Sequence, residues 1–254
     1  MKKRLIGLAA MAALISAPAL AADLPVKAGP PPLPAWSWTG CYFGGQAGGA
    51  FGYDMITDVG TLAGVPFSAG GVPGGTVPIR PYGWFGGGQV GCNYELPAHY
   101  VIGIEGDGGE LGLTSNTILQ PGTTTNTRIG INSGALGDVT GRMGLAVGQM
   151  LIYVKIGWAF YDGRPAISSL APGFAGTSNV GTFNGYTVGG GFEFHLMGNW
   201  TAKLEYLHYG FENLNFNVLA AGGPFPFQEL LRMDTIRLGV NYKFDWGGPV
   251  VARY

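Results

Sequence analysis

Charged residues are scarce in this sequence. Only 11% of its 254 residues are Asp, Glu, Lys or Arg, where a typical soluble domain has about a quarter, and the formal net charge is −1. This composition provides no electrostatic footprint for nucleic acid or any other strongly charged partner. Cysteine and histidine are also rare, at two and three residues. No histidine or further cysteine lies near either cysteine, so we expect no metal site and no cofactor.

Long apolar runs are missing after residue 21, where no stretch reaches 18 residues, and this excludes a helical membrane protein. The one apolar run, from Leu5 to Leu20, follows three basic residues and ends in Ala19-Leu20-Ala21. It is shorter than the ~20 residues that a membrane-spanning helix needs. It therefore predicts a signal peptide, residues 1–21, cleaved after Ala21. An uncleaved anchor helix is the alternative.

Aromatic residues and glycine are abundant, at 13% and 47 residues. An exported chain with little charge, many aromatic residues and no helical span fits a membrane β-barrel. The outer wall of such a barrel faces lipid, and its backbone groups pair around a closed ring.

Eight segments of about ten residues alternate between apolar and polar side chains, as the strands of a membrane barrel do. In the last segment, Ile236, Leu238 and Val240 share one parity, while Arg237 and Lys243 share the other. A period of two places these sets on opposite faces of a strand. The predicted strands are 39–52, 82–95, 100–113, 132–146, 150–161, 185–197, 200–212 and 234–245.

The connections between these segments alternate strictly between short and long. The short ones lie around Leu96–His99, Val147–Gln149 and Gly198–Asn199, and the long ones at 53–81, 114–131, 162–184 and 213–233. Brief periplasmic turns and extended surface loops produce this pattern. We therefore predict an all-β, eight-stranded antiparallel up-and-down transmembrane β-barrel, with six or ten strands as alternatives. Proline and threonine are concentrated in the long loops, which we expect to be irregular and mobile.

The parity of the segments places charged side chains inside the barrel, where acids and bases are nearly balanced. This favours a lumen filled by ion pairs, because an unpaired buried charge costs several kcal/mol. A narrow gated pore whose salt bridges rearrange is the alternative. The ion-pair residues are Glu105, Asp107, Arg142, Lys155, Glu193, Lys203, Glu205 and Arg237; Gln89, Asn93, Glu95, Asp138 and Lys243 share the inward parity.

Several motifs resemble those of the small outer-membrane β-barrels of alphaproteobacteria, a porin-like, surface-antigen group similar to OmpA-type and opacity-type barrel domains. These motifs are Ala22-Asp23-Leu24-Pro25, Trp36-Ser37-Trp38-Thr39-Gly40, Gly103–Asp107, Leu204–Leu207 and Arg237–Phe244. The resemblance implies a structural protein of the Gram-negative cell envelope, with loops that meet host or cell-surface ligands. It divides the chain into a signal peptide (1–21), a Pro-rich periplasmic spacer (22–38), the barrel (39–246) and a C-terminal tail (247–254).

The resemblance also implies an assembly signal at the end of the barrel. Arg237, Gly239, Tyr242 and Phe244 match the pattern that the β-barrel assembly machinery recognises, a polar residue followed by glycine and two aromatic residues. Such signals usually end the chain, whereas ten residues follow Phe244 here. The tail either replaces Phe244 as the docking end or folds back.

Cys41 and Cys92 lie near the periplasmic ends of the first two segments, with the same outward parity. In the resembling family these positions are usually aromatic, so a paired replacement fits a disulfide formed in the oxidising periplasm. Two free, lipid-facing thiols are the alternative, because the disulfide requires the Cα atoms to lie within about 7 Å.

Other candidate motifs have simpler interpretations. Gly86–Gly91 satisfies G-x-G-x-x-G, but it continues into an alternating strand instead of opening a helix, so we expect no dinucleotide site. No nucleophile can be placed beside His99, His195 or His208, which we interpret as interface residues. Aromatic residues mark two expected interface girdles. They are Trp36, Trp38, Tyr42, Tyr94, Tyr100 and Trp200 below, and Trp84, Trp158, Phe160, Tyr209 and Phe211 above.

The sequence thus predicts a non-enzymatic outer-membrane protein that serves envelope integrity and surface interactions. A narrow porin is the main alternative. An enzyme acting on lipid A and a soluble lipocalin-like barrel rank below it. A lipocalin-like barrel would need a polar outer wall, whereas the fifth and eighth segments predict an apolar one.

Overall fold

The computed structural model describes residues 36–59, 61–62, 65–66, 76–115, 117–118, 127–131, 133–163, 165–169, 174–178, 181–220 and 223–244. The expected signal peptide, most of the expected spacer and the C-terminal tail lie outside these residues. The chain divides into two units, Met1–Ala35 and Trp36–Tyr254, and the described residues belong to the second. Within them, no helix is long and apolar enough to cross a membrane.

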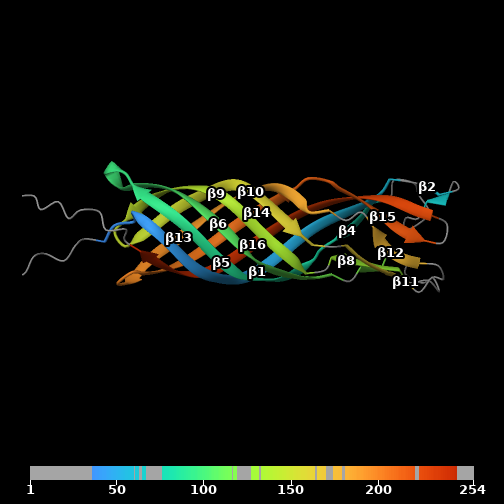
Figure 1. The fold of residues 1–254 in the computed structure, drawn as a ribbon, viewed down its shortest axis with the longest axis horizontal. Helices are drawn as coiled ribbons and strands as arrows, with labels where there is room; N and C mark the ends of the chain where they lie inside the picture. Colours follow the sequence, from blue (N-terminus) through green and yellow to red (C-terminus); the bar gives the residue numbers. More distant parts are fainter. Residues whose placement is uncertain are drawn as a thin grey trace, which may run out of the picture. The chain divides into compact units, whose positions relative to one another are not determined.

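Eight antiparallel strands form a closed ring, because each pairs with the next and the last pairs with the first (Figure 1). This confirms the predicted eight-stranded up-and-down barrel, which the regular alternation of the segments indicated. The barrel strands are β1 (Gly40–Asp58), β5 (Tyr82–Glu95), β6 (Tyr100–Thr114), β9 (Gly134–Val147), β10 (Met150–Asp162), β13 (Phe183–Met197), β14 (Trp200–Phe211) and β16 (Gly223–Phe244).

The register around the ring gives the barrel a shear of ten residues. The path of paired residues runs through Tyr42, Gly91, Glu105, Thr140, Gly157, Thr187, Tyr209 and Met233 and returns to β1 at Gly52. The difference between its two ends, 52 − 42, is ten positions along β1. A barrel of eight tilted strands has an interior just wide enough for side chains to fill.

The two faces of each strand differ sharply in exposure. On β10, Val154 and Ile156 are 63% and 67% exposed on the outer wall, while Lys155 between them is 1% exposed. The same alternation on β16 leaves Leu238 exposed and buries Arg237. Apolar side chains therefore form the outer wall and polar side chains fill the inside, the arrangement of a barrel in lipid.

Short turns join the strands at one end of the barrel, the end expected to face the periplasm. Gly148-Gln149 and Gly198-Asn199 are two-residue turns, and the first residue of each has a positive φ, 60° and 56°. The turn between β5 and β6 contains a 3-10 helix, η1 (Pro97–His99), in which Ala98 and His99 have φ of 62° and 64°. Glycine adopts this left-handed conformation without cost, whereas alanine and histidine do not.

The long loops were expected to be irregular, and for part of their described length this is wrong. β1 continues to Asp58 and stays paired with β16 as far as Phe227, well beyond the predicted ends of both strands. β4 (Thr76–Ile79) extends the sheet beside β1, and β15 (Leu214–Ala220) extends it beside β16. Strand pairing needs only backbone groups, so it continues where the apolar alternation of the outer wall has ended.

Further short strands lie in the long loops. Figure 1 shows several of them at the end of the barrel where β4 and β15 lie. They are β2 (Thr61–Leu62), β3 (Val65–Pro66), β7 (Thr117–Ile118), β8 (Thr127–Ile131), β11 (Pro165–Ser169) and β12 (Phe174–Ser178).

The outer wall carries an apolar band bordered by aromatic side chains. On β1 the band covers Cys41–Phe51 and on β16 Ile236–Phe244, and past Ile236 the outward side chains become polar at Asp234 and Arg232. We take these stretches as the membrane-spanning parts of the two strands. The exposed aromatic side chains at the borders are Tyr94, Tyr100 and Trp200 below and Trp84, Trp158 and Tyr186 above.

Five aromatic residues expected in the girdles lie elsewhere. Trp38, Tyr42, Tyr209 and Phe211 are at most 4% exposed and lie inside the barrel, and Trp36 is half-buried at its lower end. The strand parity already places Tyr42, Tyr209 and Phe211 inward, because their neighbours Cys41 and His208 point outward. Proximity to a strand end was the wrong criterion, since a girdle residue must also face lipid.

Candidate functional site: the barrel interior

Glu105 of β6 accepts hydrogen bonds from two lysines of other strands inside the barrel. Its Oε1 lies 2.7 Å from the Nζ of Lys155 on β10 and 3.0 Å from that of Lys203 on β14. Its Oε2 accepts a hydrogen bond from the hydroxyl of Tyr42 and lies 3.4 Å from Nη1 of Arg142. All five side chains are at most 3% exposed. A carboxylate this deeply buried is stabilised by such a set of donors.

Asp107 and Glu205 complete the environment of the two lysines. Lys155 Nζ lies 2.8 Å from Asp107 and 3.3 Å from Glu205, and Lys203 Nζ lies 3.8 and 3.6 Å from the same residues. The hydroxyl of Tyr153 donates to Glu205 at 2.9 Å, and Gln46 donates to Asp107. Two ammonium groups are thus shared among three carboxylates.

Glu105, Asp107 and Glu205 have ligand oxygens within 4.8 Å of one another, a grouping that could in principle hold a metal ion. The two ammonium groups already contact all three carboxylates. With the guanidinium of Arg142 beside Glu105, three positive charges face three carboxylates, so the arrangement is that of an ion-pair core.

Arg142 forms the lower end of this network. Its guanidinium donates to Glu193, and its Cζ lies over the ring of Tyr153, 3.8 Å from the ring centroid. Glu193 also accepts from Thr201 at 2.6 Å and from Asn241 at 2.9 Å. Five different strands meet in these contacts.

Arg237 forms the upper end. Its Nη1 lies 3.9 Å from Asp138, and Nη2 donates to the hydroxyl of Tyr209, which in turn donates to Asp138 at 2.7 Å. The guanidinium also packs over Phe85, 3.9 Å from the ring centroid. An arginine with both a carboxylate and aromatic faces is well suited to burial.

The eight ion-pair residues named from the sequence all lie inside the barrel and all take part in ion pairs. Gln89, Asn93, Asp138 and Lys243 are also buried there, whereas Glu95 lies half-buried at the lower rim. The hydroxyls of Tyr42 and Tyr209 are members of the network that the sequence interpretation missed, and the alternation along β1 and β14 is the signal that would have found them.

An apolar layer crosses the lumen directly above the ion pairs. Its thirteen buried residues come from all eight barrel strands and are each at most 4% exposed. The rings of Tyr161, Phe183 and Phe211 pack against one another with centroids 6.0–6.2 Å apart. The layer comprises Ala50, Phe85, Leu111, Leu113, Leu136, Ala159, Tyr161, Phe183, Leu207, Tyr209, Phe211, Leu231 and Met233.

Residues 36–39 close the lower end of the lumen. Trp38 packs among Val101, Ala146, Leu151 and Tyr153, and its backbone N–H donates to Glu95 at 2.9 Å. Trp36 stacks on His195 with centroids 3.8 Å apart. Residues 36–38 were expected in the periplasmic spacer and the two tryptophans in a girdle; instead they fold against the barrel.

Lys243 anchors the same segment from β16. Its ammonium group donates to the carbonyl oxygens of Ser37 and Thr39 and lies 4.2 Å from the ring centroid of Trp36. Hydrogen bonds from the backbone of Trp38 and from the side chain of Lys243 thus hold residues 36–39 at the lower opening of the barrel.

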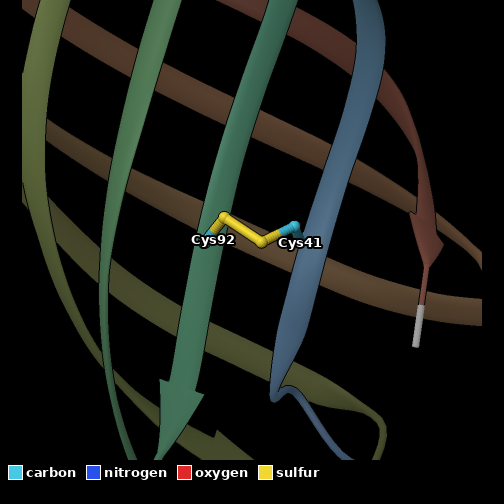
Figure 2. Close-up of a disulfide and its surroundings, with 2 residues drawn as sticks. All are labelled: Cys41 and Cys92. Carbon is cyan, nitrogen blue, oxygen red and sulfur yellow. A yellow bond between two sulfur atoms is a disulfide. The ribbon is translucent and has the colours of Figure 1, made fainter. Parts of the chain in front are cut away.

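Cys41 and Cys92 are directly opposite each other on β1 and β5 and are joined by a disulfide (Figure 2). Their Cα atoms lie 3.9 Å apart, and the bond lies on the outer wall. No free cysteine remains in the described chain. The cross-link ties together two strands that are rich in glycine, where the pairing register is otherwise weakly specified.

Comparison with known families identifies the fold at the level of a protein family. The model of the outer membrane protein beta-barrel domain matches residues 7–244, most of the chain. The chain belongs to this family. As a member of it, the protein resides in the outer membrane, with its barrel embedded in the lipid.

Relatives from alphaproteobacteria support the same placement. A 31 kDa outer-membrane immunogenic protein of Brucella melitensis is 29% identical, over 93% of this chain and 98% of the relative. A 22 kDa outer membrane protein of Rhizobium leguminosarum is 27% identical, over 88% of this chain and 83% of the relative. The resemblance carried by the motifs therefore extends over most of the length of these relatives.

Solved barrels align with the chain at low sequence identity. Neisserial surface protein A matches 80% of this chain and 97% of its own, with a TM-score of 0.36 and 11% identity. The outer membrane protein OprG from Pseudomonas aeruginosa matches 81% of this chain and 97% of its own, with a TM-score of 0.46 and 10% identity.

Proposed function

We propose that this protein is a closed, non-conducting barrel that supports the cell envelope and displays its long loops for contacts at the cell surface. The observation that carries the proposal is the filling of the lumen. Ion pairs occupy its middle, an apolar layer crosses it above, and residues 36–39 close it below. A narrow porin, the alternative function, would need a continuous polar path through the apolar layer.

Conductance in planar bilayers tests the proposal. We expect purified, heat-modifiable protein to produce no reproducible current steps in concentrated KCl. A matched positive control removes three rings that pack together in the apolar layer through Tyr161→Ala, Phe183→Ala and Phe211→Ala, and we expect this variant to conduct. Stable, salt-dependent steps from the native protein would establish the porin function instead.

A role at the cell surface is supported by the names of the relatives, since the Brucella protein is called immunogenic. We infer that the loops of this chain are likewise exposed to host or cell-surface ligands. Deletion strains test both parts of the role. Loss of the gene should raise sensitivity to bile salts, and a variant with shortened long loops should restore resistance while losing surface binding.

We propose that the barrel has no enzymatic activity. The described contacts of the histidines are with carboxylates, a carbonyl and the rings of Trp36 and Tyr186, which provide no activated nucleophile. His208 donates to or accepts from Asp234 at 2.8 Å on the outer wall, the same carboxylate that accepts from Tyr206. Unchanged lipid A mass spectra in a deletion strain are expected; an altered acyl chain pattern would refute the proposal.

We also propose export through the signal peptide and insertion by the β-barrel assembly machinery. β16 ends at Phe244, the last aromatic residue of the expected signal Arg237, Gly239, Tyr242 and Phe244, and the tail lies outside the described residues. Phe244→Ala should lower the amount of heat-modifiable protein in the outer membrane, whereas removal of residues 247–254 should not. The reverse result would place the docking end in the tail.

A further inference from the structure

Two acids lie together on the seam where the first and last strands close the barrel. Asp54 of β1 is paired with Leu231 of β16, and Ile56 of β1 is paired with Glu229 of β16. The two acids are therefore diagonal neighbours across the seam. Both lie on the extracellular side of the membrane-spanning parts, Cys41–Phe51 and Ile236–Phe244.

Both acids are completely buried, with 0% exposure, and no described residue donates a hydrogen bond to any of their four carboxylate oxygens. Apolar side chains surround them. Leu231 and Met233 lie on the membrane side, and further along the strands Ile56 and Phe227 are buried as well. β4 contributes Ile79, which is paired with Asp54.

Among the described side chains, the titratable group that faces the pair is the phenol of Tyr161 on β10. Burial, and then the charge of Glu229, raise the pKa of Tyr161, so it stays neutral. Charged side chains on the packed strands are exposed at the surface and do not reach the pair: Arg80, Glu110, Asp162 and Arg232. The described structure thus provides no cation to compensate two buried carboxylates.

Two adjacent carboxyl groups in an apolar site cannot both ionise at low cost, so they share a proton. Burial raises the pKa of Asp54 to about 7. Burial, and then the charge of Asp54, raise the pKa of Glu229 well above its ordinary value. While the pair holds at least one proton, the two side chains bridge the seam. When both carboxylates are charged, they repel each other across it.

We propose that the extracellular end of the β1–β16 seam is a proton-held latch, closed while Asp54 and Glu229 retain a proton and open when both are ionised. Opening frees residues 54–58 of β1 and 227–231 of β16 from each other. The membrane-spanning part of the seam remains paired, because its contacts do not include the acid pair.

The direction of the pH dependence follows from proton linkage. In an unfolded chain, the pKa values of both acids are about 4, so between about pH 4 and 7 the closed latch binds more protons than the open one. The stability of the latch is therefore fully present below about pH 4 and falls as the pH rises through about 7. The seam should be closed in mild acid and loosened in mild alkali.

Amide hydrogen exchange of the full-length protein in nanodiscs tests the latch. After correction for the intrinsic exchange rate, protection of the amides of residues 227–231 should fall about tenfold or more between about pH 5.5 and 8.5. Protection of residues 236–240, on the same strand inside the membrane, should not change. Equal corrected protection of 227–231 at both pH values would overturn the proposal.

Variants separate the acid pair from other titrations. Asp54→Asn combined with Glu229→Gln keeps the shape of both side chains and removes the charge, so protection should become independent of pH. Glu110→Gln combined with Asp162→Asn neutralises two exposed acids and should retain the native pH response. The proposal is overturned if neutralising Glu110 and Asp162 abolishes the pH response. It is also overturned if Ca²⁺ restores native protection at about pH 8.5, because the acid pair would then be a cation site.

Discussion

Lys155 and Glu105 meet inside the barrel, with 2.7 Å between Nζ and Oε1, although their strands β10 and β6 share no backbone hydrogen bonds. β9 lies between the two strands on the wall. The ion pair therefore ties together parts of the wall that the sheet itself does not pair. Lys203 extends the link to β14, on the far side of β13.

Replacement of the central carboxylate should be costly. Glu105→Gln leaves Lys155, Lys203 and Arg142 with one fewer compensating charge in a buried site, and removal of one partner of a buried pair costs about 3–5 kcal/mol. Unfolding in urea, followed by the shift of the heat-modifiable band, measures the change. Glu110→Gln, at an exposed position of the same strand, should leave the midpoint unchanged. Similar midpoints for both variants would show that the lumen ion pairs contribute little.

Loss of the disulfide should also lower stability. The bond joins residues 51 positions apart, and a cross-link closing a loop of this length contributes about 4 kcal/mol in the chain-entropy model. Free-thiol titration of the purified protein should find no reactive thiol. Cys41→Ala combined with Cys92→Ala should match the reduced native protein in urea, and both should unfold earlier than the oxidised native protein. Identical midpoints with and without reductant would contradict a stabilising role.

A glycine in the first periplasmic turn should stabilise the barrel. Ala98 has φ of 62°, a left-handed conformation that costs a residue with a Cβ about 1–2 kcal/mol. Ala98→Gly removes this cost and should raise the free energy of unfolding by about 1 kcal/mol. Ala135→Gly, at a position of β9 that is paired on both sides, provides the opposite control and should lower it by about 0.5–1 kcal/mol. A destabilised Ala98→Gly variant would show that this turn has another conformation in the membrane.

Glycines on the two faces of the wall should differ in their tolerance of alanine. A Cβ on the inward Gly157 would overlap the carbonyl oxygen of Val139, whereas a Cβ on the outward Gly108 would meet nothing within 4 Å. Gly157→Ala should therefore cost about 1–3 kcal/mol, as overpacking does, while Gly108→Ala should be neutral or slightly stabilising. Urea midpoints of the two variants check the difference, and equal effects would mean that the backbone at Gly157 has more room than the structure shows.

Much of the barrel could be predicted from the chain alone, since a strand with one face in lipid and one face inside must alternate. Because Arg237 stands between the apolar Ile236 and Leu238, the inward direction of its side chain follows from the sequence without tertiary information. The short turn at Gly198-Asn199 makes the strands on either side of it neighbours. The same alternation places Tyr42 and Tyr209 inside, because parity, and not nearness to a strand end, decides which face a side chain takes. The pairing of Asp58 with Phe227 was missed because backbone pairing leaves no side-chain pattern where the apolar wall has ended.

Alternation along each strand is a local property, and it determined which side chains enter the lumen and which face the lipid. The partner of each inward side chain was decided by the tertiary structure alone. Lys155 meets Glu105, and Asp54 meets Glu229, because ring closure with a shear of ten residues sets the height of every strand against the others. That shear belongs to all eight strands together, so no single segment of sequence contains it.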